Sequence, residues 1–222
     1  QIAEMDNDDV RPLTRRIKSW VENAIVRKII SNRDSTIDWD TIVDEGKILL
    51  VRIPVDSKDV HQMISLTVIR NLWSAKKRQS RDDNRETVPY FLQLDEFERI
   101  ANDNLQVENM LVRARSMWLS ICLGTQYPYQ IEKDHSDVMR AMENNANTLL
   151  AMRTPGKKDA KLLMSRFREY EKEDLITTNI YECWTKLPLE SGKETEPVRL
   201  DMFAPYPALR SEDEAKKVIE YS

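Results

Sequence analysis

The stretch VPYFLQLDEFERIA, from Val88 to Ala101, decides the fold. Its apolar run over 88–94 ends in two adjacent acids, Asp95 and Glu96, and further charge follows at once. A nearly continuous apolar run is typical of a strand buried on both faces in a parallel sheet. Active sites of such sheets lie outside the carboxyl ends of the strands. The acid pair is therefore either the solvent end of a buried strand or half of a nucleotide-hydrolysis site.

The surrounding sequence alternates between strand-like and helix-like segments. Short apolar runs predict three further strands, over 47–53, 117–124 and 147–153. Helical periodicity lies between them, over 60–77, 104–115 and 137–145. This alternation implies crossover connections and an α/β fold, a mostly parallel sheet with helices on both faces.

The two ends of the sequence are read differently. Residues 11–31 predict an amphipathic helix, whose buried face is Leu13, Ile17, Trp20, Val21, Ala24, Ile25 and Ile29. After a helical segment at 157–173, the runs 177–186 and 198–203 predict a C-terminal β-hairpin with Gly192 in its connection. Ser211 and Glu214 stand in capping-box positions for a last helix. No domain boundary is evident, so we expect a single domain, 1–222, with a helical lead-in (1–35), a sheet core (36–205) and a terminal helix (206–222).

Composition narrows the class of protein. The 222 residues carry a net charge of −4, which gives no overall attraction to nucleic acid or to a membrane surface. Cys122 and Cys183 are far apart and form no CxxC pair, so a disulfide framework or zinc site is not expected and a reducing compartment fits best. Neither His61 nor His135 has a Cys or His neighbour that would make it a metal ligand. No apolar run approaches the roughly 20 residues of a membrane helix, and the N-terminus has no signal-peptide pattern.

Polar side chains follow the predicted strands at their carboxyl ends. Asp95 and Glu96 follow one strand, Gly124-Thr125-Gln126 the next, and Arg153 the last. Phosphoryl transfer needs a carboxylate for Mg²⁺, a group that orients water and a positive charge for the phosphates. An acid doublet at the end of an apolar strand has the Walker B arrangement, and a glutamine at the tip of the next strand makes the pattern more specific.

Three segments together resemble a known superfamily. YFLQLDEFERIA, VRARSMWLSICLGTQYPYQI and NNANTLLAMRT look like successive motifs of the HerA/FtsK superfamily, nearest to the TraG-like conjugation ATPases of type IV secretion. The resemblance extends over 11–203 and is strongest over 90–153. It implies a RecA-like P-loop NTPase fold and a ring, usually a hexamer, that uses ATP and Mg²⁺ to move DNA or protein. Such a motor is cytoplasmic, or peripheral at the inner face of the membrane, and meets its membrane complex through other segments.

The resemblance also assigns roles to residues. Asp95 matches the acid that attends to Mg²⁺, Glu96 the catalytic glutamate, and Gln126 the glutamine that senses the γ-phosphate. Arg115 matches an arginine that reaches the nucleotide of a neighbouring subunit, although it could instead pair with an acid on its own helix face. Arg153 is a second candidate for phosphate or inter-subunit contact, with a structural role as the alternative.

One part of the family pattern is missing. A P-loop needs GxxxxGK[ST], and none of the four glycines, Gly46, Gly124, Gly156 and Gly192, fits it. We therefore expect the C-terminal part of a longer ATPase, without its P-loop strand, that by itself binds ATP weakly or not at all. The alternative is a non-hydrolysing structural subunit with a degenerate ATPase fold. A DNA-binding module without nucleotide is less favoured, because no basic stripe with interleaved aromatic residues occurs.

Overall fold

The computed structural model describes residues 17–18, 21–32, 35–53, 57–102, 107–167, 172–205 and 211. Its contacts divide the chain into two compact units, residues 1–146 and 147–222, which are described separately below. The expectation of one domain stays a prediction. No helix in the described part of the chain is both long enough and apolar enough to cross a membrane.

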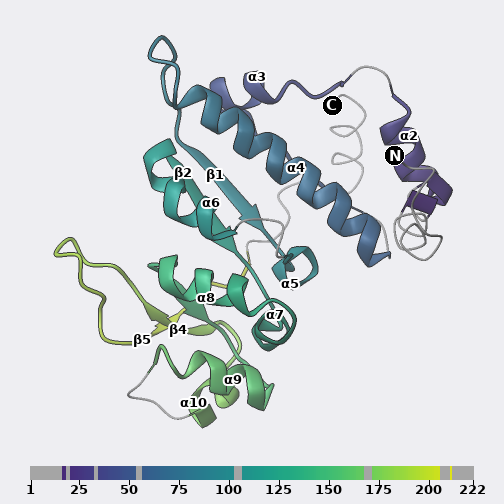
Figure 1. The fold of residues 1–222 in the computed structure, drawn as a ribbon. Coiled ribbons are helices and arrows are strands. Elements are labelled where there is room, and N and C mark those ends of the chain that lie inside the picture. The colour runs from purple at the N-terminus through teal and green to yellow at the C-terminus, as the bar shows by residue number, and fades with distance from the viewer. Residues whose placement is uncertain are drawn as a thin grey trace. The chain divides into compact units, whose positions relative to one another are not determined.

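The first unit is built around two parallel strands. Strand β1 (Tyr90–Leu94) pairs with β2 (Leu119–Leu123), from Tyr90 opposite Leu119 to Leu94 opposite Leu123. Between them the chain passes through α5 (Phe97–Ile100), α6 (Val107–Ala114) and the 3-10 turn η3 (Arg115–Met117). Helices α7 (Pro128–Asp134) and α8 (Ser136–Asn145) follow β2. The predictions of these two strands, and of helices at α6 and α8, are confirmed (Figure 1).

The long helix α4 (Lys58–Gln79) fixes the start of β1 through buried polar contacts. The Lys76 side chain is fully buried, and its ammonium donates to the Val88 carbonyl (2.6 Å) and to Gln79 Oε1 (2.7 Å). Gln79 in turn donates to Asp44 Oδ1 (2.8 Å), at the end of α3 (Trp39–Asp44). Burial lowers the pKa of Lys76, because a charged ammonium is less stable away from water. Its two hydrogen bonds offset part of this loss. The network thus joins α3, α4 and the residues that lead into β1.

The predicted buried face of the N-terminal helix is wrong where the structure describes it. Helix α2 (Ala24–Ile30) forms, but Ile17, Val21 and Ile29 are exposed. Val26 is buried instead, against Val60 of α4 and the partly buried side chains of Ile53, Met63 and Ile64. Periodicity defines a helix, but it does not define which turn meets a neighbour. The positions Leu13 and Trp20 lie outside the described residues.

The predicted strand over 47–53 does not form. All seven residues are described and none belongs to a strand, while Ile48 and Leu50 are 88% and 89% exposed. The segment meets Tyr90, whose hydroxyl donates to the Lys47 carbonyl (2.9 Å). A strand exists only when a second backbone pairs with it, and in the described chain the parallel sheet consists of β1 and β2.

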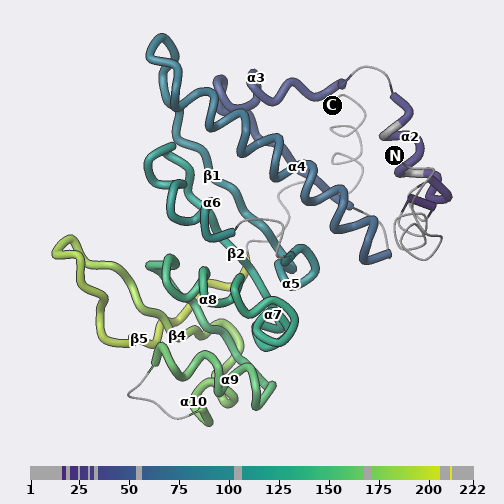
Figure 2. The backbone as a smooth tube through the Cα atoms, viewed as in Figure 1, coloured from purple at the N-terminus to yellow at the C-terminus, as the bar shows by residue number. Residues whose placement is uncertain are grey.

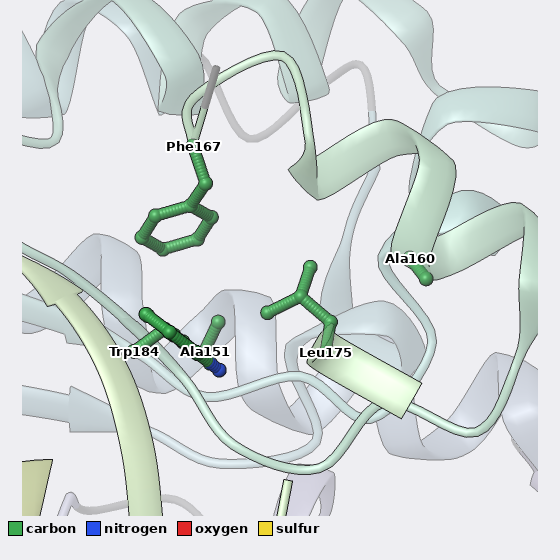
Figure 3. Close-up of a cluster of buried hydrophobic side chains, with 5 residues drawn as sticks. All are labelled: Ala151, Ala160, Phe167, Leu175 and Trp184. Carbon is green, nitrogen blue, oxygen red and sulfur yellow. The ribbon is translucent and has the colours of Figure 1, made fainter. Parts of the chain in front are cut away.

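The second unit is an antiparallel sheet packed on two short helices. The strand order is β3 (Leu149–Ala151), β4 (Glu182–Lys186), β5 (Val198–Asp201). Helices α9 (Lys157–Leu163) and α10 (Lys172–Thr177) lie between β3 and β4 in the sequence. Figure 2 shows α9, α10, β4 and β5 along the backbone. They enclose a cluster of buried side chains, shown in Figure 3, formed by Ala151, Ala160, Phe167, Leu175 and Trp184.

The antiparallel sheet corrects the predicted pairing of the strand over 147–153 and confirms the predicted C-terminal hairpin. The strand expected over 147–153 forms as β3 but pairs antiparallel with β4, from Leu149 opposite Lys186 to Ala151 opposite Trp184, so it does not extend the parallel pair. A local apolar run predicts a strand but not its partner. The C-terminal hairpin is confirmed as β4 and β5. Strand β4 is shorter than predicted, because α10 extends to Thr177 and the chain turns over residues 178–181, where Tyr181 has a φ of +65°. The terminal helix lies outside the described residues, apart from Ser211.

Candidate functional site

The carboxyl ends of β1 and β2 are joined by backbone hydrogen bonds. The Gly124 N–H donates to the Leu94 carbonyl (2.8 Å), and the Phe97 N–H donates to the Gly124 carbonyl (2.8 Å). The acid pair that follows β1 is therefore held beside the Gly124-Thr125-Gln126 turn that follows β2. The sequence argument predicts this meeting of the two turns.

The backbone at Glu96 adopts an uncommon conformation. Its φ is +48°, in the left-handed region that few residues other than glycine adopt. The Asp95 carboxylate stabilises this turn, because its Oδ1 accepts a hydrogen bond from the Glu96 N–H (2.9 Å). Helix α5 begins at the next residue. Non-glycine residues in this region cluster at functional sites, where the surrounding structure supports the strain.

Gly124 leaves room for the Asp95 carboxylate. A Cβ atom added at Gly124 would lie 3.2 Å from Asp95 Oδ1 and 3.7 Å from the Leu94 carbonyl oxygen. The contact with Asp95 Oδ1 is shorter than most real Cβ contacts, so a side chain at 124 would crowd the acid, whereas the contact with the Leu94 carbonyl is an ordinary one. The glycine is needed here for space, and it allows the carboxylate to lie directly against the second turn.

Glu96 has a partner on its own helix. Its Oε2 accepts a hydrogen bond from Arg99 Nη1 (2.9 Å), and the Arg99 N–H donates to the Glu96 carbonyl (2.9 Å). Both side chains are a little under half exposed, at 44% for Glu96 and 43% for Arg99. The candidate catalytic carboxylate is therefore accessible to water and paired at one oxygen.

Helix α4 brings a histidine into the field of this ion pair. Gln62 Nε2 donates to the Ala101 carbonyl (3.1 Å), which ties the first turns of α4 to the end of α5. The pKa of the adjacent His61 is lowered by burial and by the positive charge of Arg99, while Glu96 acts in the opposite direction. Its Nδ1 lies 3.5 Å from the Ser65 hydroxyl.

Gln126 lies on the turn after β2 and is exposed. The preceding Thr125 shapes this turn, since its hydroxyl accepts a hydrogen bond from the Tyr127 N–H (3.3 Å) before α7 begins at Pro128. Asp95, Glu96 and Gln126 thus belong to two turns at one edge of the parallel pair.

Arg115 lies at the other end of the sheet. It is exposed in η3, before β2 begins at Leu119. A strand of five residues spans about 16 Å, so the strand separates Arg115 from the edge that carries the acids. Arg153 follows β3 and is exposed, in the second unit. Both assignments stay predictions.

The chemistry of the acid edge suits a hard cation that is shared with a phosphate. Carboxylate, hydroxyl and amide oxygens are the ligands that Mg²⁺ prefers, and in nucleotide sites it takes only one or two from protein. Among the described residues, no group of three or more His, Cys, Asp or Glu side chains could hold a metal ion by itself. The Asp95 carboxylate, which lies against Gly124, would supply a single carboxylate contact.

Sequence reasoning missed three residues of this site. The space left by Gly124 was not foreseen, although the glycine belongs to the quoted GTQ turn. The Glu96–Arg99 pair could have been found, because residues three apart in a helical stretch lie on one face. The place of His61 could not, because it depends on how α4 packs on α5.

Comparison with known proteins now bears on the fold. No protein-family model matches the sequence. No curated protein matches it at a significant level either. The solved structures with a similar fold include two of the plasmid coupling protein TrwB, one in complex with the non-hydrolysable GTP analogue GDPNP and one in complex with ADP and Mg²⁺.

The likeness to TrwB is extensive in space and slight in sequence. The two matches have TM-scores of 0.62 and 0.63 at 12% identity, and each covers 94% of this chain. The chain spans 57% of the length of the TrwB chains. At this identity the likeness shows the fold alone. The predicted α/β fold is confirmed, and it is similar to the fold of these TrwB structures.

Proposed function

We propose that this chain is a segment of an ATP-driven motor of the conjugation kind, and that the edge formed by Asp95, Glu96 and Gln126 is the acid half of its nucleotide site. The observation that carries the proposal is the Asp95 carboxylate lying against Gly124, where the carboxyl ends of two parallel strands join. The bound nucleotides of the two TrwB structures support it.

Each residue of the edge has a distinct role in this proposal. Glu96 accepts a hydrogen bond from the attacking water, for which its partly exposed carboxylate is suited. Gln126 contacts the γ-phosphate or the water through its amide, from the turn after β2. Gly124 keeps the two turns close enough for Asp95 and Gln126 to act on the same ligand.

Asp95 is the residue that would hold Mg²⁺, directly or through water. When bound, the ion would neutralise charge on the phosphates. The hydrogen bond from the Glu96 N–H leaves the second oxygen of Asp95 for this contact.

The phosphates need a second group of ligands from outside these residues. GxxxxGK[ST] does not occur in the sequence, so the loop that holds the phosphates is supplied by other sequence or another subunit. Arg115, at the opposite edge of the sheet, would act on the nucleotide of a neighbouring copy in a ring, and Arg153 would add a phosphate or inter-subunit contact. DNA or protein is the cargo, and a membrane secretion complex is met through other segments.

The test is ATP turnover by the full-length protein with Mg²⁺, measured as phosphate release. Glu96→Gln keeps the shape of the side chain and removes the base, so turnover falls about 100-fold or more. Asp95→Asn gives a comparable loss. Glu108→Gln, which neutralises an exposed acid on α6, is the matched control and leaves turnover unchanged.

The rival function is a non-hydrolysing assembly subunit, which the lack of a phosphate-binding motif in these residues favours. It predicts no turnover above background in the wild type and no response to Glu96→Gln. Turnover that survives Glu96→Gln would remove Glu96 from the chemistry.

A further inference from the structure

The Glu96–Arg99 ion pair has a property that the proposed site does not use. Glu96 Oε2 already accepts a hydrogen bond from Arg99 Nη1 at 2.9 Å. This hydrogen bond takes one acceptor position of Oε2 and turns the carboxylate toward Arg99 on α5. The carboxylate is therefore restrained in the conformation that the structure shows.

Contacts at the two ends of α5 hold Arg99 and Glu96 together. Glu96 precedes the helix with φ of +48°, and Arg99 is bound to it twice, through the side chains and through the backbone hydrogen bond of Arg99 N–H to the Glu96 carbonyl. The end of the same helix is fixed to α4 by the bond from Gln62 to the Ala101 carbonyl. Backbone contacts at both ends of α5 thus keep Arg99 within reach of Glu96.

The pair can also open. Both side chains are a little under half exposed, so water screens their attraction and can replace the hydrogen bond when the pair separates. A fully buried pair would be a permanent structural link. The half-exposed Glu96–Arg99 pair is instead a restraint that a ligand bound beside Asp95 and Gln126 can release.

We propose that Arg99 is a positioning residue for Glu96, which holds the carboxylate on α5 until a nucleotide and its water compete for it. This inference rests on the proposed function, because it requires a nucleotide and its water at the site, which the Glu96 carboxylate binds when it leaves Arg99. Arg99 itself touches neither nucleotide nor water in this scheme.

The pair can first be tested on this chain without any nucleotide. The sequence has two histidines, so ¹H NMR follows His61 and His135 as separate signals. Since Arg99 lowers the pKa of His61 and Glu96 raises it, Arg99→Gln raises the pKa and Glu96→Gln lowers it further. Arg99→Lys keeps the charge and gives a smaller change than Arg99→Gln.

A matched control separates this local effect from a general change in charge. Arg140→Gln removes another arginine that pairs with an acid three residues away on a helix, Asp137 of α8, and it leaves the pKa of His61 unchanged. If Arg99→Gln moves His61 no more than Arg140→Gln does, the arrangement of Arg99 around Glu96 is wrong and the inference fails, whatever becomes of the proposed function.

The positioning role is then tested in turnover by the full-length protein. Releasing Glu96 by Arg99→Gln raises kcat about twofold to fivefold, the range that an exposed ion pair corresponds to, and leaves KM unchanged. Arg99→Lys, which keeps the positive charge, has the same kcat as the wild type. A merely structural role predicts a lower kcat or none of these changes, and either result overturns the inference. Loss of turnover in Glu96→Gln remains the separate test of the proposed function.

Discussion

Two of the Glu–Arg pairs in the described part of the chain, Glu96–Arg99 at the acid edge of the first unit and Glu182–Arg199 in the sheet of the second, differ in how many hydrogen bonds the carboxylate accepts. Glu182 on β4 accepts hydrogen bonds at both oxygens: Oε2 from Arg199 Nη2 (2.5 Å) and from the Asn179 N–H (3.1 Å), and Oε1 from Asn179 Nδ2 (3.1 Å). Its side chain is 14% exposed. Glu96 has one such partner and is 44% exposed.

The difference separates an acid that supports a fold from an acid that can act on a ligand. Arg199 is the main cause that lowers the pKa of Glu182 to about 2, and Asn179 adds to the effect. With its acceptor sites occupied, this carboxylate links β4 to β5 and to the turn before β4. Glu96 keeps acceptor capacity for a further partner, and its backbone has a positive φ at the turn where Asp95 lies against Gly124. Spare hydrogen-bonding capacity, rather than an acid beside an arginine, is what marks the candidate site.

The largest effect is expected in the core that supports the second unit. Trp184→Ala removes a side chain packed with Phe167 and Leu175 and breaks the hydrogen bond from Trp184 Nε1 to Thr178 Oγ1 (3.1 Å). We expect the free energy of unfolding to fall by about 3–5 kcal/mol, as measured by urea denaturation followed by circular dichroism.

Trp118→Ala is the matched control, because Trp118 is 63% exposed at the start of β2. Its cost should stay within about 0.5 kcal/mol. Equal losses at the two tryptophans would contradict the placement of Trp184 in the buried cluster of the second unit.

An intermediate effect, dependent on pH, is expected at the structural pair. The folded pKa of Glu182 lies near 2, below its ordinary value of 4.5, so the pair stabilises the fold above pH 4.5 and loses that contribution as the pH falls toward 2. Glu182→Gln should therefore be less stable than the wild type at neutral pH, and the two should converge in acid.

Denaturation curves of both proteins across this pH range measure the convergence. Glu190→Gln, at an exposed acid in the β4–β5 connection, is the control and should track the wild type at every pH. A difference between Glu182→Gln and the wild type that stayed constant with pH would mean that the carboxylate charge does not hold β4 to β5.

Local patterns predicted the elements of this fold well, and non-local pairing explains the failures. Helices α4, α6 and α8 and strands β1 and β2 follow from periodicity and continuous apolar runs, which neighbouring residues determine. The segment 47–53 has the same apolar character, yet no backbone in the described part of the chain pairs with it, and Ile48 and Leu50 are exposed. The run over 147–153 forms a strand, but its antiparallel partner β4 comes from more than thirty residues further on.

The site was predictable to the extent that it depends on topology. The rule that chemistry gathers at the carboxyl ends of parallel strands brings Asp95 and Gln126 to one edge, and the joined turns agree with it. The rule says nothing of how side chains are held there. The pairing of Glu96 with Arg99 follows from their spacing of three residues in a helical stretch. The approach of His61 arises from the packing of α4 on α5 and needed the structure.

The smallest effect on stability is expected at Gly124, the residue that lies against the Asp95 carboxylate. In Gly124→Ala the new Cβ would lie 3.2 Å from Asp95 Oδ1, so the carboxylate must move by a few tenths of an ångström. Gly124 is not among the residues with positive φ, so its backbone accepts alanine without strain. The free energy of unfolding should change by no more than about 0.5 kcal/mol.

Turnover should respond more than stability does, because a misplacement of about 1 Å in an active site can cost about 100-fold and a smaller shift costs less. We expect Gly124→Ala to lower the ATP turnover of the full-length protein about threefold to tenfold. Cys122→Ala, at an exposed position two residues earlier on β2, is the control and changes neither quantity. If Gly124→Ala lowered stability and left turnover intact, the glycine would serve the packing of the two turns, and the acid edge would resemble the pair at Glu182 more than a site open to a ligand.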